Sequence, residues 1–243
     1  MNTVTLYPVA GLPLIHEGDD LAAILLDGIV TSVGIVDNDV LVVAQKIVSK
    51  AEGSVIELST VTPSEHAKEI ATKTGRDPRL CQIYLNEAKE VLAIKGRMVI
   101  TRHRIGFVGS SSGVDRSNVG PHELGKVVLL PKDPDASARR IRNHIAKTTQ
   151  KRIAVIINDS CGRDYRGGSV GMAIGIAGIS AIEARHKKDL FGNDSNSQIA
   201  LVDELAAAAS MLMGQANEGV PAVLIRGMRF TINEDARITN LLN

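Results

Sequence analysis

Short continuous runs of apolar residues recur along the chain and predict strands that are buried on both faces. Residues 39–44, 153–157 and 222–225 consist almost entirely of Val, Ile, Leu and Ala, and such runs are short for helices. The same kind of pattern predicts further strands at 3–7, 98–101, 104–108 and 127–130, and a glycine-rich extended segment at 168–179.

Helix signals lie between these runs. Asp19 or Asp20 is expected to cap a helix that continues to Ile29, and residues 62–65, Thr-Pro-Ser-Glu, fit a capping box with Pro at the first helical position. That second helix is predicted to end near Gly75. The other predicted helices span 77–92, 133–145 and 202–213. Because strands and helices interleave irregularly, the pattern favours a mixed α+β fold in one domain, 1–243, over a regular doubly wound sheet.

Composition narrows the classes of protein further. Aromatic residues make up 2% of the 243 residues, with no Trp, so the core must be aliphatic and a base-stacking platform for nucleic acid is not expected. The formal net charge of +1 provides no global field toward nucleic acid or an anionic membrane. Residues 1–14 lack the pattern of a signal peptide, and no apolar stretch is long enough to span a bilayer. We therefore expect a cytoplasmic protein.

The segment at 153–168 carries the strongest chemical signal. An apolar strand leads directly into Asp159 and Ser160, and a carboxylate at the rim of a sheet is well placed to hold a hard cation and its phosphate ligands. Arg163 and Arg166 follow in a glycine-containing loop, where guanidinium groups suit phosphate or carboxylate oxygens. From composition alone, an ordinary surface turn explains this segment equally well.

A second candidate segment is the loop of small residues at 109–118. Asp115 is a potential metal ligand, and Asn118 is able to read a base edge or a phosphate oxygen. Together with Asp159, Asp115 would complete the two-carboxylate site that metal-assisted phosphoryl chemistry requires. Taken alone, the loop is more simply a flexible polar turn.

Two further segments offer charges and oxygen ligands. Lys46 and Lys50 are four residues apart and would present two charges to phosphates if that turn is helical. Residues 213–221 form a glycine-bounded polar turn in which Gln215 or Glu218 offers an oxygen to a second metal. The simpler explanations are two surface lysines whose stems lie on the protein and a helix C-cap before a strand.

Two familiar nucleotide-binding motifs are missing from the sequence. Residues 120–127 nearly spell a Walker A loop, but Val127 stands where Ser or Thr is required, and a strand is predicted where the motif needs a helix. The glycines at 171, 175 and 178 do not have the spacing of a Rossmann fingerprint. Cys81 and Cys161 are expected to be packed thiols, neither nucleophiles nor a disulfide framework.

Taken together and in order, these segments resemble the coenzyme F420:L-glutamate ligase family, also called coenzyme F420-0 γ-glutamyl ligase. The resemblance covers nearly the whole chain. Several motifs that occur in the same order are far more specific than any single motif. The segments that carry it are 8–21, 47–53, 113–119, 158–163 and 203–221, with 173–179 and 189–192 in addition.

The resemblance implies a function and an assembly. Members of that family join L-glutamate to the side chain of the deazaflavin coenzyme through γ-linked amides, with GTP and divalent metal, usually magnesium or manganese. We expect two divalent ions and a monovalent cation. The implied fold is α+β with two lobes in an intertwined homodimer, neither a P-loop nor a Rossmann fold. The implied substrates are coenzyme F420-0 and L-glutamate, with no nucleic acid or membrane partner.

The resemblance also assigns site residues position by position. Asp115, Asp159 and Ser160 match metal positions, with Gln215 as a further metal contact and Glu218 second to it. The implied catalytic residues are Asp115, Asp159, Lys50 and Arg163. The positions that match GTP-binding residues are Gly11, Leu12, Pro13, Leu14, Gln45, Lys46, Lys50, Asn118, Met213, Gly214, Gln215, Ala216, Asn217, Glu218, Gly219 and Val220.

Departures from the family leave two alternatives open. Many relatives read Cys-Ala-Asn-Ala at 109–112, where this chain has Gly-Ser-Ser-Ser, and Ser160 and Cys161 replace Thr and Phe.

For the reaction itself we expect an acyl phosphate, formed by phosphoryl transfer from GTP to a carboxylate and then attacked by the glutamate amine. The alternatives are a ligase for another carboxylate acceptor, suggested by the Ser110–Ser112 departure, and a nucleotide-binding regulatory module with the same fold.

Overall fold

A five-stranded mixed sheet forms the centre of the computed structural model, which describes residues 3–121, 125–163 and 166–242. Its strands are β1 (Thr5–Val9), β2 (Val40–Ala44), β8 (Ala154–Arg163), β9 (Arg166–Ala177) and β12 (Ala222–Arg226). They lie in the order β1-β12-β2-β8-β9. β2 and β8 are parallel, and the other neighbours are antiparallel.

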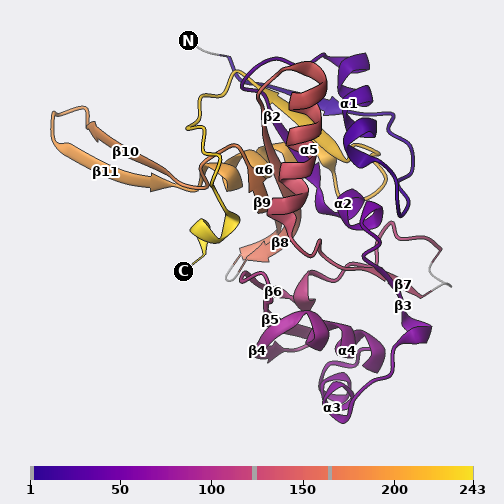
Figure 1. The fold of residues 1–243 in the computed structure, drawn as a ribbon. Helices are drawn as coiled ribbons and strands as arrows, with labels where there is room; N and C mark the ends of the chain where they lie inside the picture. Colours follow the sequence, from indigo (N-terminus) through magenta and orange to yellow (C-terminus); the bar gives the residue numbers. More distant parts are fainter. Residues whose placement is uncertain (1–2, 122–124, 164–165, 243) are drawn as a thin grey trace.

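Helices cover both faces of this sheet (Figure 1). α1 (Leu21–Ser32) and α5 (Pro134–Thr149) pack on one face, and α6 (Leu201–Met213) packs on the other. Along β2, Leu41 and Val43 enter the first core while Val40 and Val42 enter the second. A strand that is buried on both faces has no polar face to show, which accounts for the continuous apolar runs in the sequence.

A third hydrophobic core lies in the lower part of Figure 1, within the long connection from β2 to β8. It is formed around α3 (Glu65–Thr74) and α4 (Pro78–Glu87), beside the antiparallel sheet of β4 (Ala88–Lys95), β5 (Met98–His103) and β6 (Val108–Ser110). The remaining elements are α2 (Gln45–Ala51), the paired β3 (Val55–Glu57) and β7 (Lys126–Val128), the hairpin of β10 (Glu183–Lys188) and β11 (Asp194–Ile199), and the short helices Leu58–Thr60, Ser111–Gly113 and Ile238–Leu241.

Most helix boundaries follow the predicted capping signals. Asp20 and Asp133 cap α1 and α5, and the left-handed Gly75 ends α3. The capping box at 62–65 was wrong, because Ser64 is the cap and its hydroxyl accepts from the Ala67 amide at 3.2 Å. The proline therefore stands before the cap, not at the first helical position.

Three predicted elements differ from the structure. The helix predicted for 77–92 ends at Glu87, because residues 88–95 pair with β5 through cross-strand contacts that a local pattern does not reveal. The strand predicted for 104–108 begins only at Val108, after a turn. The apolar strand at 153–157 continues as β8 through Asp159 to Arg163, because β9 pairs with it over that length.

The predicted α+β class is confirmed. Among the described residues, no helix has the length and apolar character needed to cross a bilayer. The single 1–243 domain, its two lobes and the homodimer stay predictions.

The sheet core gives a first testable prediction. Leu224 of β12 is fully buried, so Leu224→Ala should lower the free energy of unfolding by about 2–5 kcal/mol through the cavity that it leaves. Chemical denaturation measures this quantity. Met211 is 76% exposed, and Met211→Ala should stay within about 0.5 kcal/mol of the parent. An equally small effect of Leu224→Ala would contradict its place in the core.

Candidate active-site cleft

One edge of the central sheet gathers three chain segments. β2 ends at Ala44, which lies opposite Asn158 of the parallel strand β8, so Asp159 follows directly at the same edge. The Ala44 amide donates to the Pro221 carbonyl at 2.8 Å, which places the start of β12 there as well. The carboxyl ends of parallel strands are where open α/β sheets bind ligands.

A cleft of about 1040 Å³ opens at this edge. Its lining includes most residues that the sequence predicted for a nucleotide and metal site. These are Leu12, Pro13, Leu14, Gln45, Lys46, Lys50, Asp115, Asn118, Asp159, Ser160, Met213, Gly214, Gln215, Ala216, Asn217, Gly219 and Val220. No Phe or Tyr occurs among the described residues that line it, as the low aromatic content led us to expect.

A salt bridge joins α2 to the loop after the Ser111–Gly113 helix. The Lys46 ammonium group lies 2.7 Å from Asp115 Oδ2 and donates to Ser117 Oγ at 2.6 Å. The Ser117 amide in turn donates to Asp115 Oδ1 at 2.7 Å. These bonds fix both oxygens of the carboxylate. Because α2 is helical, Lys46 and Lys50 lie on one face, as predicted.

Two further bonds connect that loop and β8 to the turn at 213–221. Asn118 Nδ2 donates to the Ala216 carbonyl at 2.7 Å, and Ser160 Oγ donates to Gln215 Oε1 at 2.9 Å. With the Lys46–Asp115 salt bridge, they form a chain of contacts from α2 through the loop and the turn to β8. Segments far apart in the sequence are thereby held around one cleft.

The two carboxylates of the cleft have opposite pKa shifts. Burial raises the pKa of Asp159, and the nearby negative charge of Asp115 raises it further. Burial also acts to raise the pKa of Asp115, but hydrogen bonds from Lys46 and Ser117 outweigh it and lower the pKa overall. Two partly buried carboxylates repel each other when both are ionised. A cation that binds between them offsets this repulsion, so the pair favours cation binding.

The oxygen donors fit a magnesium-type ion. Carboxylate, hydroxyl and amide oxygens from Asp115, Asp159, Ser160 and Gln215 face one cleft, and hard divalent cations prefer oxygen. The described residues contain no group of three or more His, Cys, Asp or Glu side chains placed to hold a metal. Magnesium usually keeps several waters and takes substrate phosphates as ligands, so a few protein oxygens suffice.

Three predicted site residues do not line the cleft. Gly11 precedes the lining loop, and Arg163 lies exposed across from Arg166 near the end of the β8–β9 hairpin. The Glu218 carboxylate turns back to accept from the Ala216 amide at 2.8 Å, and that bond contributes most to its lowered pKa. Of the two polar residues considered in this turn, Gln215 therefore faces the cleft.

The sequence reasoning missed one wall of the cleft. This wall is lined by Val55 and Glu57 of β3 and Lys126 of β7. Their side chains share a face of the two-stranded ribbon, while Ile56 and Val127 point into the third core. Only the register of β3 and β7 reveals this, since each strand is three residues long. Ser117 and Asn158 also line the cleft. Both lie within the candidate segments 109–118 and 153–168, although neither was named as a site residue.

The departures at 109–112 lie outside the described lining of the cleft. The Ser112 side chain is buried, where its hydroxyl donates to the Tyr84 carbonyl at 2.7 Å and lies 3.0 Å from Thr101 Oγ1. Cys81 is buried in the third core, and burial raises the pKa of both Cys81 and Cys161. Neither thiol is therefore an activated nucleophile, in keeping with the prediction.

Comparisons with known proteins place these features in a family. A family model described as F420-0:Gamma-glutamyl ligase matches residues 11–227. The chain is 42% identical over 227 residues to coenzyme F420:L-glutamate ligase of Methanothermobacter thermautotrophicus, covering 92% of this chain and 89% of that protein. It is 44% identical to the proteins of the same name from Methanocaldococcus jannaschii, over 89% of this chain and 85% of that one, and Archaeoglobus fulgidus, over 93% and 88%.

These matches, which span nearly the whole fold and every segment of the cleft, define an amide-bond-forming ligase. More particularly, the chain belongs to the F420-0:γ-glutamyl ligase family, and the resemblance found in the sequence is confirmed.

The electrostatics of the cleft give a second prediction. The Lys50 pKa should lie below 10.5, because burial and the positive Lys46 both disfavour the charged form. NMR titration of lysine side chains that carry an isotope label measures the Lys50 pKa. Lys46→Met should move the midpoint of the Lys50 titration upward. Lys132→Met, at an exposed position outside the cleft lining, should leave it unchanged. A Lys50 midpoint at or above 10.5 would show that the side chain is not partly buried.

Proposed function

We propose that this ligase uses GTP and a divalent metal to add L-glutamate to coenzyme F420-0, and then adds further γ-linked glutamates. The observation that carries the proposal is the chain of contacts around the cleft, which unites two carboxylates with Lys46 and Lys50. Oxygen ligands and ammonium groups on one cleft are what a metal–nucleoside triphosphate requires. The relatives' shared name supports the choice of coenzyme F420 and L-glutamate.

The proposed reaction proceeds in two steps. A carboxylate oxygen of the acceptor attacks the γ-phosphorus of GTP, and the bond to the bridging oxygen breaks, which releases GDP and leaves an acyl phosphate. The amine nitrogen of L-glutamate then attacks the carbonyl carbon, phosphate leaves, and the nitrogen loses a proton. Lys46 and Lys50 would stabilise the negative charge on the phosphate oxygens. Neither step requires a covalent enzyme nucleophile.

Metal ligation would fall to four residues. Asp115, Asp159, Ser160 and Gln215 would hold the divalent ions, which offset the charge of the phosphates during transfer. Two of these residues already contact each other through the Ser160–Gln215 hydrogen bond. Lys46, which pairs with Asp115, would keep that carboxylate oriented toward the cleft. A monovalent cation is part of the same proposal.

The proposal includes a homodimer that works in the cytoplasm. The β10–β11 hairpin projects away from the rest of the molecule in Figure 1, and the intervening Leu190 and Phe191 are 100% and 91% exposed. Apolar side chains at the end of a projecting arm favour a protein partner over solvent. A second copy of the chain is the partner that the resemblance implies.

The two alternatives remain distinguishable from this function. The Ser110–Ser112 departure lies outside the described lining of the cleft, so its position does not support another acceptor. A regulatory module would bind GTP without releasing GDP when acceptor and L-glutamate are added.

The central test is a mass measurement of product. Protein incubated with GTP, manganese, L-glutamate and coenzyme F420-0 should yield glutamyl adducts together with GDP. A chelator should stop the reaction, and added magnesium or manganese should restore it, because the phosphate charge is otherwise uncompensated. Adduct formation without metal would contradict the metal assignment, and GTP binding without any adduct would favour the regulatory alternative.

The carboxylate of Asp159 gives a residue-level test. Asp159→Asn should lower the rate of GDP release by about a hundredfold or more, since a divalent ion would lose an anionic ligand and the phosphate charge would be less well compensated. The circular dichroism spectrum should stay unchanged. Asp27→Asn is the matched control, because Asp27 is exposed on α1 and lies outside the cleft lining. Full activity of Asp159→Asn would refute its role.

A further inference from the structure

α2 carries Gln45, Lys46 and Lys50 into the cleft but is too short to hold its own orientation. It has seven residues, and an isolated helix of that length is not stable in water. Its C-cap is Glu52, where the negative end of the helix dipole disfavours an anion. A charge that opposes its own helix needs a compensating contact elsewhere.

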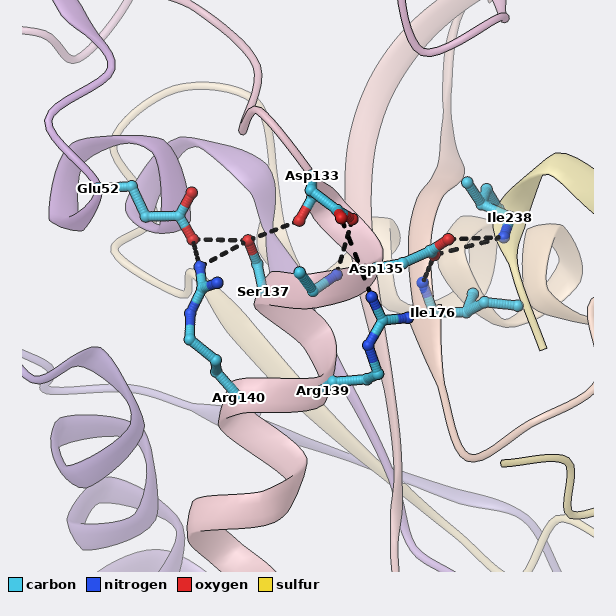
Figure 2. A network of polar contacts seen from close by, with 9 residues as sticks. Glu52, Asp133, Asp135, Ser137, Arg139, Arg140, Ile176 and Ile238 are labelled. Atoms are coloured by element: carbon cyan, nitrogen blue, oxygen red, sulfur yellow. Dashed lines mark hydrogen bonds and ion pairs between the residues drawn. The ribbon is translucent and has the colours of Figure 1, made fainter. Parts of the chain in front are cut away.

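Figure 2 shows that compensating contact on α5. Glu52 Oε1 accepts from Ser137 Oγ at 2.5 Å and also accepts from Arg140 Nη2. Arg140 Nη2 lies 3.1 Å from the same hydroxyl, so the three side chains form a closed triangle. Ser137 lies near the N-terminal end of α5, where the helix dipole favours an anion. The Glu52 carboxylate therefore interacts unfavourably with the dipole of α2 and favourably with the dipole of α5.

The same end of α5 also forms hydrogen bonds with β9 of the central sheet (Figure 2). Asp135 Oδ1 accepts from the Ile176 amide of β9 at 2.8 Å, and Asp135 also accepts from the Ile238 amide. Gly175 permits this approach, because a Cβ there would lie 2.5 Å from the Pro134 carbonyl carbon. β9 pairs with β8, the strand that contains Asp159. The start of α5 therefore contacts both the end of α2 and β9, the strand that pairs with the Asp159 strand.

We propose that Glu52 is a positioning residue for the nucleotide side of the cleft. Its bonds to Ser137 and Arg140 fix α2 on α5, and so fix Lys46 and Lys50 relative to Asp159. Glu52 lies outside the cleft lining, so it acts through α2 and not on a ligand. The assignment rests on the proposed GTP site.

The test compares two carboxylates that pair with the same helix. Glu52→Ala should weaken the binding of a fluorescent GTP analogue roughly tenfold, the size expected for losing hydrogen bonds to a charged group. Glu234→Ala is the matched control, because Glu234 pairs with Arg142 of α5 at 2.5 and 2.7 Å and lies outside the cleft lining. It should bind the analogue as the parent does, although it also loses an ion pair of α5.

A rescue variant and a second readout separate positioning from general loss of stability. Glu52→Gln keeps an acceptor for both donors and should recover most of the affinity. Glu52→Ala should also bring the Lys50 pKa nearer to 10.5, because a loosened α2 exposes that side chain. The KM for GTP should rise in the alanine variant while the KM for L-glutamate does not. If Glu52→Ala fails to fold, Arg140→Gln takes its place.

Several results would overturn the assignment. Parent-like GTP affinity in Glu52→Ala, or an equal loss in Glu52→Ala and Glu234→Ala, would show that the contact is only structural. If the unsubstituted protein binds no GTP, the proposed function fails. The Lys50 midpoint still decides whether Glu52 positions α2, and an unchanged midpoint in the alanine variant would refute it.

Discussion

The parallel pairing of β2 with β8 is the constraint on which the cleft depends. Its register places Ala44 beside Asn158, so that α2 leaves one strand and Asp159 continues the other at one edge. β12 is antiparallel to β2 and begins there, which places the 213–221 turn over the same edge. Every later feature of the site, from the Lys46–Asp115 salt bridge to the contact of α2 with α5, depends on that shared edge.

Local signals predicted the fold where burial and capping decide it. Continuous apolar runs located β2, β8 and β12, and Asp20, Asp133 and Gly75 marked helix ends. Residues 88–95 were expected to be helical, because only their partner strand makes them extended. The β10–β11 hairpin was not predicted at all. It is almost entirely exposed, so its sequence carries no alternation between a buried and a solvated face.

The candidate site divides in the same way. Ordered motifs predicted the residues contributed by the loop before α1, by α2, by the 115–118 loop and by the 213–221 turn, and the structure brings most of them into one cleft. Glu57 and Lys126 escaped notice because their shared face depends on the pairing of two very short strands. Arg163 was expected in a loop at the site, but it is the last residue of β8, where it pairs with Arg166 of β9, and it does not line the cleft.

The pairing of β1 with β12 has a consequence for how the chain is made. Thr5 lies opposite Arg226, so β1 is synthesised long before the strand that pairs with it. Until β12 is made, the backbone of β1 lacks this pairing. In a nascent chain the sheet edge at the cleft therefore stays incomplete until β12 has been made, and β1 is exposed to aggregation until then.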